Sequence, residues 1–147
     1  MNLSIEKTDF NINGKIILNN IILKDHMDND LLKINKVLMS IFEYNNIFKG
    51  QYSFDDISLS GLSLDIRKYS GEEQNNLKIV IEKLLSNTDS LNNQKLIKSD
   101  KIRIDNMIVK VFEGYENNFF IYDLKNLDFN DFKIDEFKLT SSIKNLK

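Results

Sequence analysis

The sequence has 147 residues, of which 41% are hydrophobic and 29% are charged, and its formal net charge is −2. This composition is typical of one folded domain and gives no electrostatic reason to expect nucleic acid as a partner. Cysteine is absent, which excludes disulfides, thiolate metal sites and cysteine nucleophiles, and no apolar run reaches the about 18 residues of a membrane-spanning helix or forms the core of a signal peptide.

Residues 3–23 are predicted to form strands. Apolar and polar side chains alternate over residues 3–12, and a mostly apolar run follows at residues 15–23. Because this run has apolar residues on both parities, either both faces of the strand are covered, or the pair Asn19-Asn20 marks a turn or bulge between two shorter strands. Gly14 is predicted to lie at a bulge.

Residues 24–30 form the clearest predicted turn, because Asp and Asn are frequent there. The single histidine, His26, stands among carboxylates, and Asp25, His26, Asp28 and Asp30 could form a hard-metal or acid–base cluster. A calcium loop of the EF-hand type needs a glycine at its sixth position and a distal glutamate, and both are missing. We therefore favour a solvated hairpin loop.

Residues 31–42 fit both a helix face and the alternation of a strand. The β-branched residues Val37 and Ile41 and the neighbouring strands favour a strand. Residues 43–49 predict a short helical turn, with Gly50 ending it.

The stretch 51–69 predicts one strand much longer than the usual length of about five or six residues. Its apolar residues change parity near Asp55-Asp56 and again near Gly61. A bulge at each place would keep the apolar side chains on one face, and serines and charged residues would occupy the other. The pattern therefore predicts a bent, one-sided strand that covers something apolar.

Residues 77–85 carry an apolar stripe at helical spacing, and Asn75 or Asn76 can cap the start of this helix. A helix of this length is marginally stable alone, so the stripe is expected to dock on the sheet. Residues 86–95 are polar and predict a loop.

Strand alternation resumes at Leu96 and changes parity once near Asn106. A turn is predicted at residues 114–118 and another strand at residues 119–124. Apolar pairs then recur every five residues up to Leu139, which favours short strand pieces joined by bulges or tight turns. No closing element follows them, so we expect a fragment of a longer protein.

Catalytic patterns are absent from the sequence, including phosphate-binding glycine loops, nucleophile elbows and metal-ligand spacings. Asp55 and Asp56 are neighbours on a predicted strand, so they would point to opposite faces and would not converge on a substrate. The chain has ten Phe and five Tyr, but no basic stripe accompanies them, so they do not predict a platform for nucleic acid bases. We expect neither an enzyme nor a bound cofactor or metal.

The predicted fold class is mainly β, with one or two short helices and long bulged strands that form a curved, open sheet. Bulges bend a sheet, and an apolar half-pipe with a polar outside suits lipid acyl chains. A closed β-rich domain, with its apolar faces packed on each other and on the helix, is the simplest alternative. The candidate lining of a groove comprises Ile57, Leu59, Leu62, Leu64, Ile66, Ile102, Ile104, Val109 and Val111.

Two stretches resemble the N-terminal region of the TamB (translocation and assembly module) proteins, in the wider AsmA-like family. They are GKIILNNIILKDHMDNDLLKINKVLMSIF at residues 14–42 and NNIFKGQYSFDDISLSGLSLDIRKYSGEEQNNLKIVIEKLL at residues 45–85. The Lys24-Asp25-His26 sequence after the first strand and the Tyr69-x-Gly71-Glu72 sequence before the helix are similar to Bacteroidota-type members. The resemblance is looser over residues 96–147.

This resemblance implies a taco-like apolar groove in a periplasmic protein that is anchored to the inner membrane. The family is associated with phospholipid transport toward the outer membrane, and with outer-membrane biogenesis alongside an Omp85-type partner. The family's membrane helix and long C-terminal β-rich body are missing here. We therefore expect residues 1–147 to be a single β-rich segment of a longer protein, with subregions 1–85 and 96–147 joined by the polar loop 86–95.

The expected partners are phospholipid acyl chains and the β-rich segments that follow in the full-length chain. An alternative hypothesis is a protein-interaction scaffold that aids outer-membrane protein assembly or secretion. Such a scaffold would pair its exposed strand edges with a client, since edge pairing supplies main-chain hydrogen bonds without sequence-specific pockets.

Overall fold

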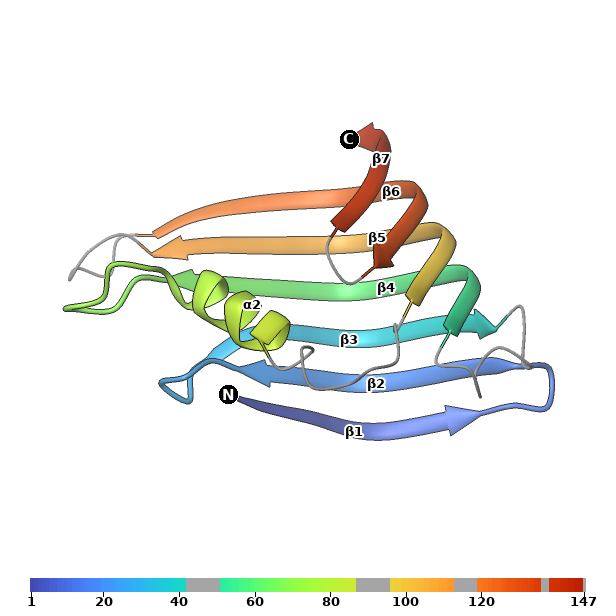
Figure 1. Ribbon diagram of the computed structural model, residues 1–147, viewed down its shortest axis with the longest axis horizontal. Coiled ribbons are helices and arrows are strands. Elements are labelled where there is room, and N and C mark those ends of the chain that lie inside the picture. The colour runs from blue at the N-terminus through green and yellow to red at the C-terminus, as the bar shows by residue number, and fades with distance from the viewer. Residues whose placement is uncertain (42–50, 87–95, 113–118, 136–137, 147) are drawn as a thin grey trace.

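The computed structural model describes residues 1–41, 51–86, 96–112, 119–135 and 138–146, and it is mainly β with one short helix (Figure 1). All the described strands belong to a single open sheet with the order β1-β2-β3-β4-β5-β6-β7. The prediction of a mainly β, curved and open sheet is confirmed. The elements are β1 (Asn2–Phe10), β2 (Lys15–Lys24), β3 (Asp30–Ile41), β4 (Gln51–Arg67), α2 (Asn76–Ser86), β5 (Leu96–Phe112), β6 (Phe119–Asp135) and β7 (Lys138–Leu146).

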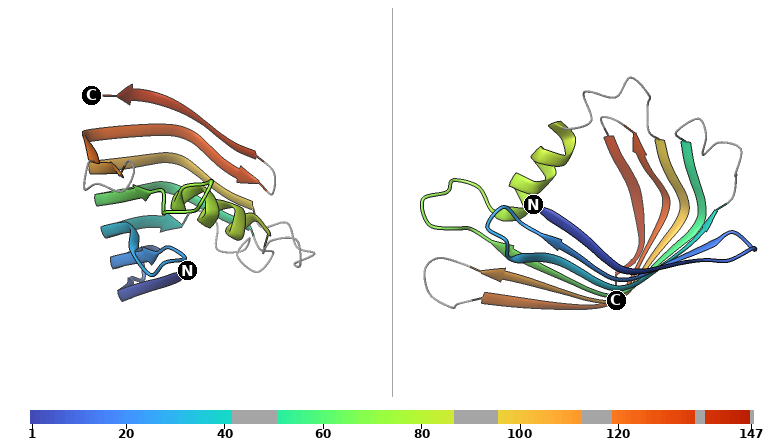
Figure 2. Two further views of the ribbon diagram at one scale, coloured as in Figure 1. Left: turned by 90° about the vertical axis from the view of Figure 1, so that its left-hand side faces the viewer. Right: turned by 90° about the horizontal axis from the view of Figure 1, so that it is seen from below.

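Neighbouring strands are antiparallel except for β4 and β5, which run parallel. A parallel pair needs a crossover connection, and α2 lies in that connection. Figure 2 shows that the sheet curves strongly and that α2 lies on its concave side. The β4–β5 pair joins the N-terminal and C-terminal strands into one continuous sheet.

One row of residues crosses six strands of the sheet and interrupts the regular ladder in each. We call it the crease row, and it comprises one residue of each strand that the pairing register skips while the residues on either side are paired. On β3, for example, Ile34 pairs with Leu62 and Lys36 pairs with Ser60, and Asn35 lies between these pairs. Three members have a left-handed backbone, with φ values of 50° at Asn20, 65° at Gly61 and 58° at Asn106. The crease row comprises Glu6, Asn20, Asn35, Gly61, Asn106 and Lys125.

The crease row changes the parity of the apolar face on all strands at the same place. On β3, Ile34 precedes the row and Val37 follows it, yet both are buried in one cluster with Ile21 and Leu62. A change of parity in one strand alone would turn its later side chains to the opposite face. Because the change is aligned across the sheet, one apolar face continues through the crease.

This geometry decides between the two interpretations of the pair Asn19-Asn20. Both residues lie inside the single strand β2, and Asn20 adopts the left-handed conformation that asparagine tolerates better than most residues. The pair therefore marks an irregularity within one strand, not a turn between two. The predicted parity changes near Gly61 and Asn106 are confirmed at the same row.

A second irregularity lies near Asp55-Asp56, as predicted. Met39 of β3 pairs with Ile57 and Ile41 pairs with Phe54, so β4 carries one more residue than β3 between these pairs. An extra residue of this kind bends its strand and increases the local twist. Figure 1 shows β4, β5 and β6 turning sharply at the ends that lie side by side.

Two local predictions are confirmed in part. Gly14 lies in the β1–β2 turn, where its N–H donates to the carbonyl oxygen of Asn11 at 3.0 Å and its φ is 73°. A glycine at positive φ that closes a three-residue hairpin loop forms a bulge, so the bulge stands at the turn and not inside a strand. The C-terminal pieces up to Asp135 are not separated by turns, since β6 runs from Phe119 to Asp135. Register shifts between β6 and β7 near Phe129 and Asn130 agree with bulges, the other form of junction that was predicted.

The predictions for residues 31–42 and for the helix are confirmed as strand β3 and helix α2. The helix is capped by Asn75, whose Oδ1 accepts a hydrogen bond from the N–H of Lys78 at 2.9 Å. Its apolar stripe docks only in part, because Val80 is 2% exposed while Ile81 is 46% exposed. The predictions for residues 43–49, 87–95 and 114–118 lie outside the described residues.

Replacing Gly61 by alanine should destabilise the protein by about 1–3 kcal/mol, because an L-residue is strained at positive φ and the new Cβ needs space. That Cβ would overlap with the side-chain amide of Asn35. Gly71→Ala is the matched control, since Gly71 has a φ of 81° but no atom within 4 Å of its Cβ position. Urea unfolding should show a larger loss for Gly61→Ala, and equal losses would contradict close packing at the crease row.

Candidate functional site

The predicted lining residues form a ladder on adjacent strands. The parallel register of β4 and β5 pairs Leu64 with Val109 and Leu62 with Met107, a residue that the sequence prediction did not include. Because directly paired residues share a face, the ladder lies on one face of the sheet. The other pairs are Ile57–Ile102, Leu59–Ile104 and Ile66–Val111.

The ladder is only half covered. Leu62 and Ile102 are each 8% exposed, whereas the other seven predicted residues are of intermediate burial. The same face continues onto the edge strand β1, where Leu3 pairs with Leu23 and Ile5 pairs with Ile21. Leu3 is 59% exposed and Ile5 is 41% exposed. A sheet with a closed core would bury these side chains more completely.

Helix α2 covers this face at one end. The helix packs mainly against β4, and an open cleft of about 400 Å³ remains between its first turn and the sheet. Ile66 and Val111 form the apolar wall of this cleft, while Asn75 and Lys78 of the helix form part of the opposite wall. The apolar face of the sheet is therefore the concave face on which the helix lies (Figure 2).

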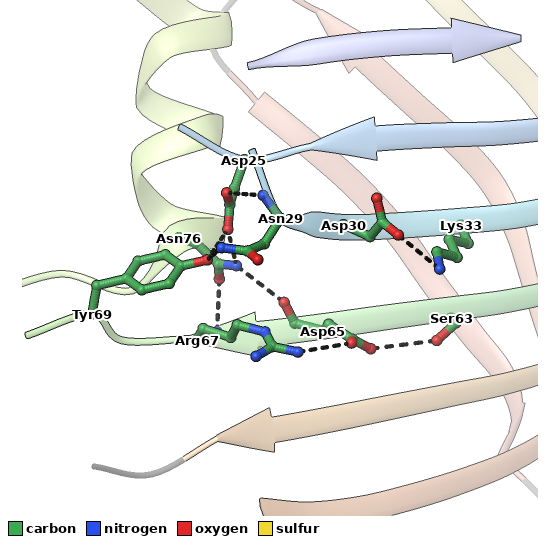
Figure 3. Close-up of polar contacts among 9 residues, drawn as sticks. All are labelled: Asp25, Asn29, Asp30, Lys33, Ser63, Asp65, Arg67, Tyr69 and Asn76. Carbon is green, nitrogen blue, oxygen red and sulfur yellow. Dashed lines mark hydrogen bonds and ion pairs between the residues drawn. The ribbon is translucent and has the colours of Figure 1, made fainter. Parts of the chain in front are cut away.

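A buried carboxylate fixes the helix to the sheet. Asp25, in the β2–β3 turn, is 1% exposed, and its Oδ1 accepts hydrogen bonds from the backbone N–H groups of Met27 at 2.9 Å and Asn29 at 3.0 Å. Its Oδ2 accepts from the Tyr69 hydroxyl at 2.5 Å and from Asn76 Nδ2 at 2.9 Å. Figure 3 shows Tyr69, Asn29 and Asn76 gathered around this carboxylate.

Asn76 connects three segments at the start of α2. Its Nδ2 donates to Asp25 and to the carbonyl oxygen of Asp65 at 3.1 Å, and its Oδ1 accepts from the backbone N–H of Arg67 at 2.8 Å. The Arg67 guanidinium lies 3.8 Å from the ring centre of Phe112 on β5. The end of β4, the β2–β3 turn and the helix are thus held together by the hydrogen bonds of the Asp25 and Asn76 side chains.

The metal or acid–base cluster of Asp25, His26, Asp28 and Asp30, which the sequence analysis considered but did not favour, does not converge. Asp28 pairs with Lys24 at 3.2 Å and Asp30 pairs with Lys33 at 2.8 Å, while His26 Nε2 lies 2.6 Å from Glu72 Oε1. Within the described ranges, no group of three His, Asp or Glu side chains is arranged to hold a metal ion. The favoured prediction of a solvated hairpin loop is confirmed for the exposed residues 27–29 of the β2–β3 turn, but it is wrong for Asp25, which is buried.

The environment of Asp25 and Tyr69 shifts both pKa values. Burial raises the pKa of Asp25, but the hydrogen bonds from Tyr69, Asn76, Asn29 and Met27 outweigh it and hold the pKa below the ordinary value of 3.8. Burial and the hydrogen bond to Asp25 raise the pKa of Tyr69 to about 12. The ionised carboxylate and the neutral phenol are therefore the stable forms.

Sequence reasoning did not find the partners of Asp25. Tyr69 and Asn76 stand 44 and 51 residues away from it, so no local spacing connects them. Asn76 was considered only as a helix cap, and the cap is its neighbour Asn75. The available signal was the density of Asp and Asn in the turn, because buried Asx residues often organise turns through backbone hydrogen bonds.

Comparison with models of known protein families gives no match, and a search of curated proteins also gives none. Among the described residues, no helix has the length and apolar character needed to cross a membrane.

Asp25→Asn should cost about 1–3 kcal/mol of stability, because an amide in place of the carboxylate leaves a buried donor without an acceptor. This loss of stability should have its full size near neutral pH, where the Asp25 carboxylate of the wild-type protein is ionised. It should shrink as the pH falls below 3.8, since a depressed pKa stabilises the fold only where the carboxylate is ionised. Unfolding curves of both proteins from pH 7 to pH 2 measure this difference. A difference that is constant over this range would contradict the ionised role of Asp25.

Tyr69→Phe removes the hydroxyl that donates to Asp25, so it tests the same hydrogen bond at alkaline pH. Because the pKa of Tyr69 is raised in the folded protein, its neutral hydroxyl stabilises the fold below pH 10. This contribution is lost as the pH rises toward about 12. The wild-type protein should therefore be more stable than the variant up to pH 10, with a gap that narrows above it. Spectrophotometric titration of tyrosinate should show one late-titrating tyrosine that is absent from Tyr69→Phe. An ordinary titration of all tyrosines would refute this assignment.

Proposed function

We propose that this chain provides an apolar groove for phospholipid acyl chains. It would be one segment of a periplasmic protein, anchored to the inner membrane, that carries phospholipid toward the outer membrane. The observation that carries this proposal is the concave apolar face, which continues through the crease row and stays partly exposed. In this role the chain binds and guides a ligand and performs no catalysis.

The dimensions and chemistry of the concave face favour an acyl chain. Facing pairs of aliphatic residues follow one another along β4 and β5 from Ile57–Ile102 to Ile66–Val111. A ladder of this kind offers dispersion contacts and apolar area along its whole length but few polar groups to fix a compact ligand. A long hydrocarbon chain gains from each successive pair, with about 0.8 kcal/mol for each methylene group removed from water.

The convex face of β4 and β5 carries most of the charged residues of these strands, although Ile108 also lies on it. Asp56 pairs with Arg103 at 3.0 Å, and Arg67 lies 3.5 Å from Asp65. Figure 3 shows Ser63, Asp65 and Arg67 along β4. This polarity lets the outside of the sheet remain in water while the inside holds hydrocarbon, which supports a groove between two membranes. In the full-length protein, the following β-rich segments would extend the groove.

The second candidate function is a scaffold that aids outer-membrane protein assembly or secretion. The open sheet favours it, because in the described part of the chain β1 and β7 each pair along one side only. A client strand, or an Omp85-type outer-membrane protein, would then add to an edge through main-chain hydrogen bonds. The groove would not be needed for this activity, so substitutions in its lining separate the two functions.

Leu64→Asp and Val109→Asp should each abolish co-purified phospholipid. The two residues face each other across β4 and β5, so either carboxylate would stand in the path of the acyl chain, where burying a charge is strongly unfavourable. Native mass spectrometry of the purified chain, with lipid extraction from the same sample, measures the occupancy. Circular dichroism confirms that each variant is folded.

Ser58→Asp is the matched control. Ser58 lies on β4 beside Arg103 of β5, so the same charge is added to the polar face where a cation can balance it. This variant should retain lipid at the wild-type level. Folded Leu64→Asp and Val109→Asp proteins that still carried lipid would overturn the groove. Client capture that survived both substitutions would favour the scaffold.

A further inference from the structure

We propose that β1 is a self-complementary edge at which two copies of this chain form a symmetric dimer with one continuous sheet. This inference concerns the edge of the sheet and does not depend on the lipid groove. It rests on the exposure of β1, on the order of its residues and on the position of the crease row within it.

Strand β1 is exposed along almost its whole length. It pairs with β2 along one side, and all its residues except Asp9 are exposed. Phe10 is 63% exposed and Leu3 is 59% exposed. A nine-residue edge with exposed apolar side chains is an effective template for pairing with another strand.

The order of residues in β1 lets two antiparallel copies of the strand place complementary side chains opposite each other. If two copies meet antiparallel with Glu6 opposite Lys7 of the second copy, Lys7 also stands opposite Glu6 of the second copy by symmetry. The same register places Ile5 opposite Thr8 and Leu3 opposite Phe10. Charges of opposite sign then meet at the centre, and apolar side chains meet on both sides of it.

The crease row makes this register geometrically consistent. In a regular strand Ile5 and Thr8 would point to opposite faces. Here Ile5 pairs with Ile21 of the apolar cluster, and Thr8 pairs with Leu18, which packs against the same cluster beyond the crease. Both residues therefore lie on the concave face. The two-fold axis passes between Glu6 and Lys7, so the crease rows of both copies meet and the concave faces join.

Neighbouring registers are less favourable. A shift by one residue in one direction places Glu6 opposite Glu6 of the second copy, and in the other direction it places Lys7 opposite Lys7. Each shift also sets Ile5 against a charged residue, Lys7 or Asp9. Like charges directly opposite each other destabilise a sheet pair. The existing contacts of these side chains, Glu6 to Asn20 and Lys7 to Asp9 at 3.0 Å, are at the surface and can exchange at little cost.

Charge exchange at the centre of β1 tests this pairing. Glu6→Lys and Lys7→Glu should each weaken the dimer by roughly tenfold, because each creates two like-charge pairs in the symmetric interface. The double variant Glu6→Lys/Lys7→Glu should dimerise like the wild-type chain, and an equimolar mixture of the two single variants should form a heterodimer. Lys125→Glu is the control, since it makes the same charge change at the crease row on β6, away from β1.

Analytical ultracentrifugation of the 147-residue chain over a wide concentration range measures these states. A wild-type dimer, lost in both single variants and regained in the double variant and in the mixture, supports the proposal. A wild-type monomer at all concentrations overturns it. A dimer that is insensitive to both single variants, or growth beyond the dimer, would also overturn it, because these outcomes require a different surface.

Discussion

Where the strands of a sheet change their side-chain parity, an apolar face can remain on one side only if neighbouring strands change at the same row. In this chain the crease row satisfies that condition across six strands, from Glu6 on β1 to Lys125 on β6. Left-handed backbone at Asn20, Gly61 and Asn106 makes the change possible without breaking the strands. The continuous cluster that joins Ile34 to Val37 across the row depends on this alignment.

The second structural requirement is a fixed position for the helix that covers one end of the concave face. Asp25 supplies it, because one carboxylate joins the β2–β3 turn, the segment after β4 and the start of α2. Four hydrogen bonds to the ionised carboxylate offset the cost of removing its charge from water. The helix is thereby held at the end of the ladder, and the middle of the ladder is left half exposed.

The long strands, the helix and the places where parity changes were predictable from the sequence, because period-two alternation is a local signal. Gly61 and Asn106 were identified in this way, and so was the irregularity near Asp55-Asp56. The alignment of these changes into one row was not predictable, since it depends on strand registers that join distant residues. The same reason hid Tyr69 as a partner of Asp25. Gly14 was predicted at a bulge inside a strand, and its bulge lies at the β1–β2 turn because the pairing of these strands is not visible in the sequence. The nine lining residues were found by alternation, but their half exposure depends on where α2 docks.

The most direct test of one continuous lipid-binding concave face is nuclear magnetic resonance of isoleucine, leucine and valine methyl groups with a spin-labelled phospholipid. Val109 and Ile108 are neighbours on β5 but face opposite sides of the sheet, and Ile108 is 39% exposed on the convex side. The spin label should broaden the methyl signals of Leu59 and Leu64, which lie on either side of the crease row, together with Val109, and should leave Ile108 sharp. Broadening that followed exposure, with Ile108 affected as strongly as Val109, would contradict the groove.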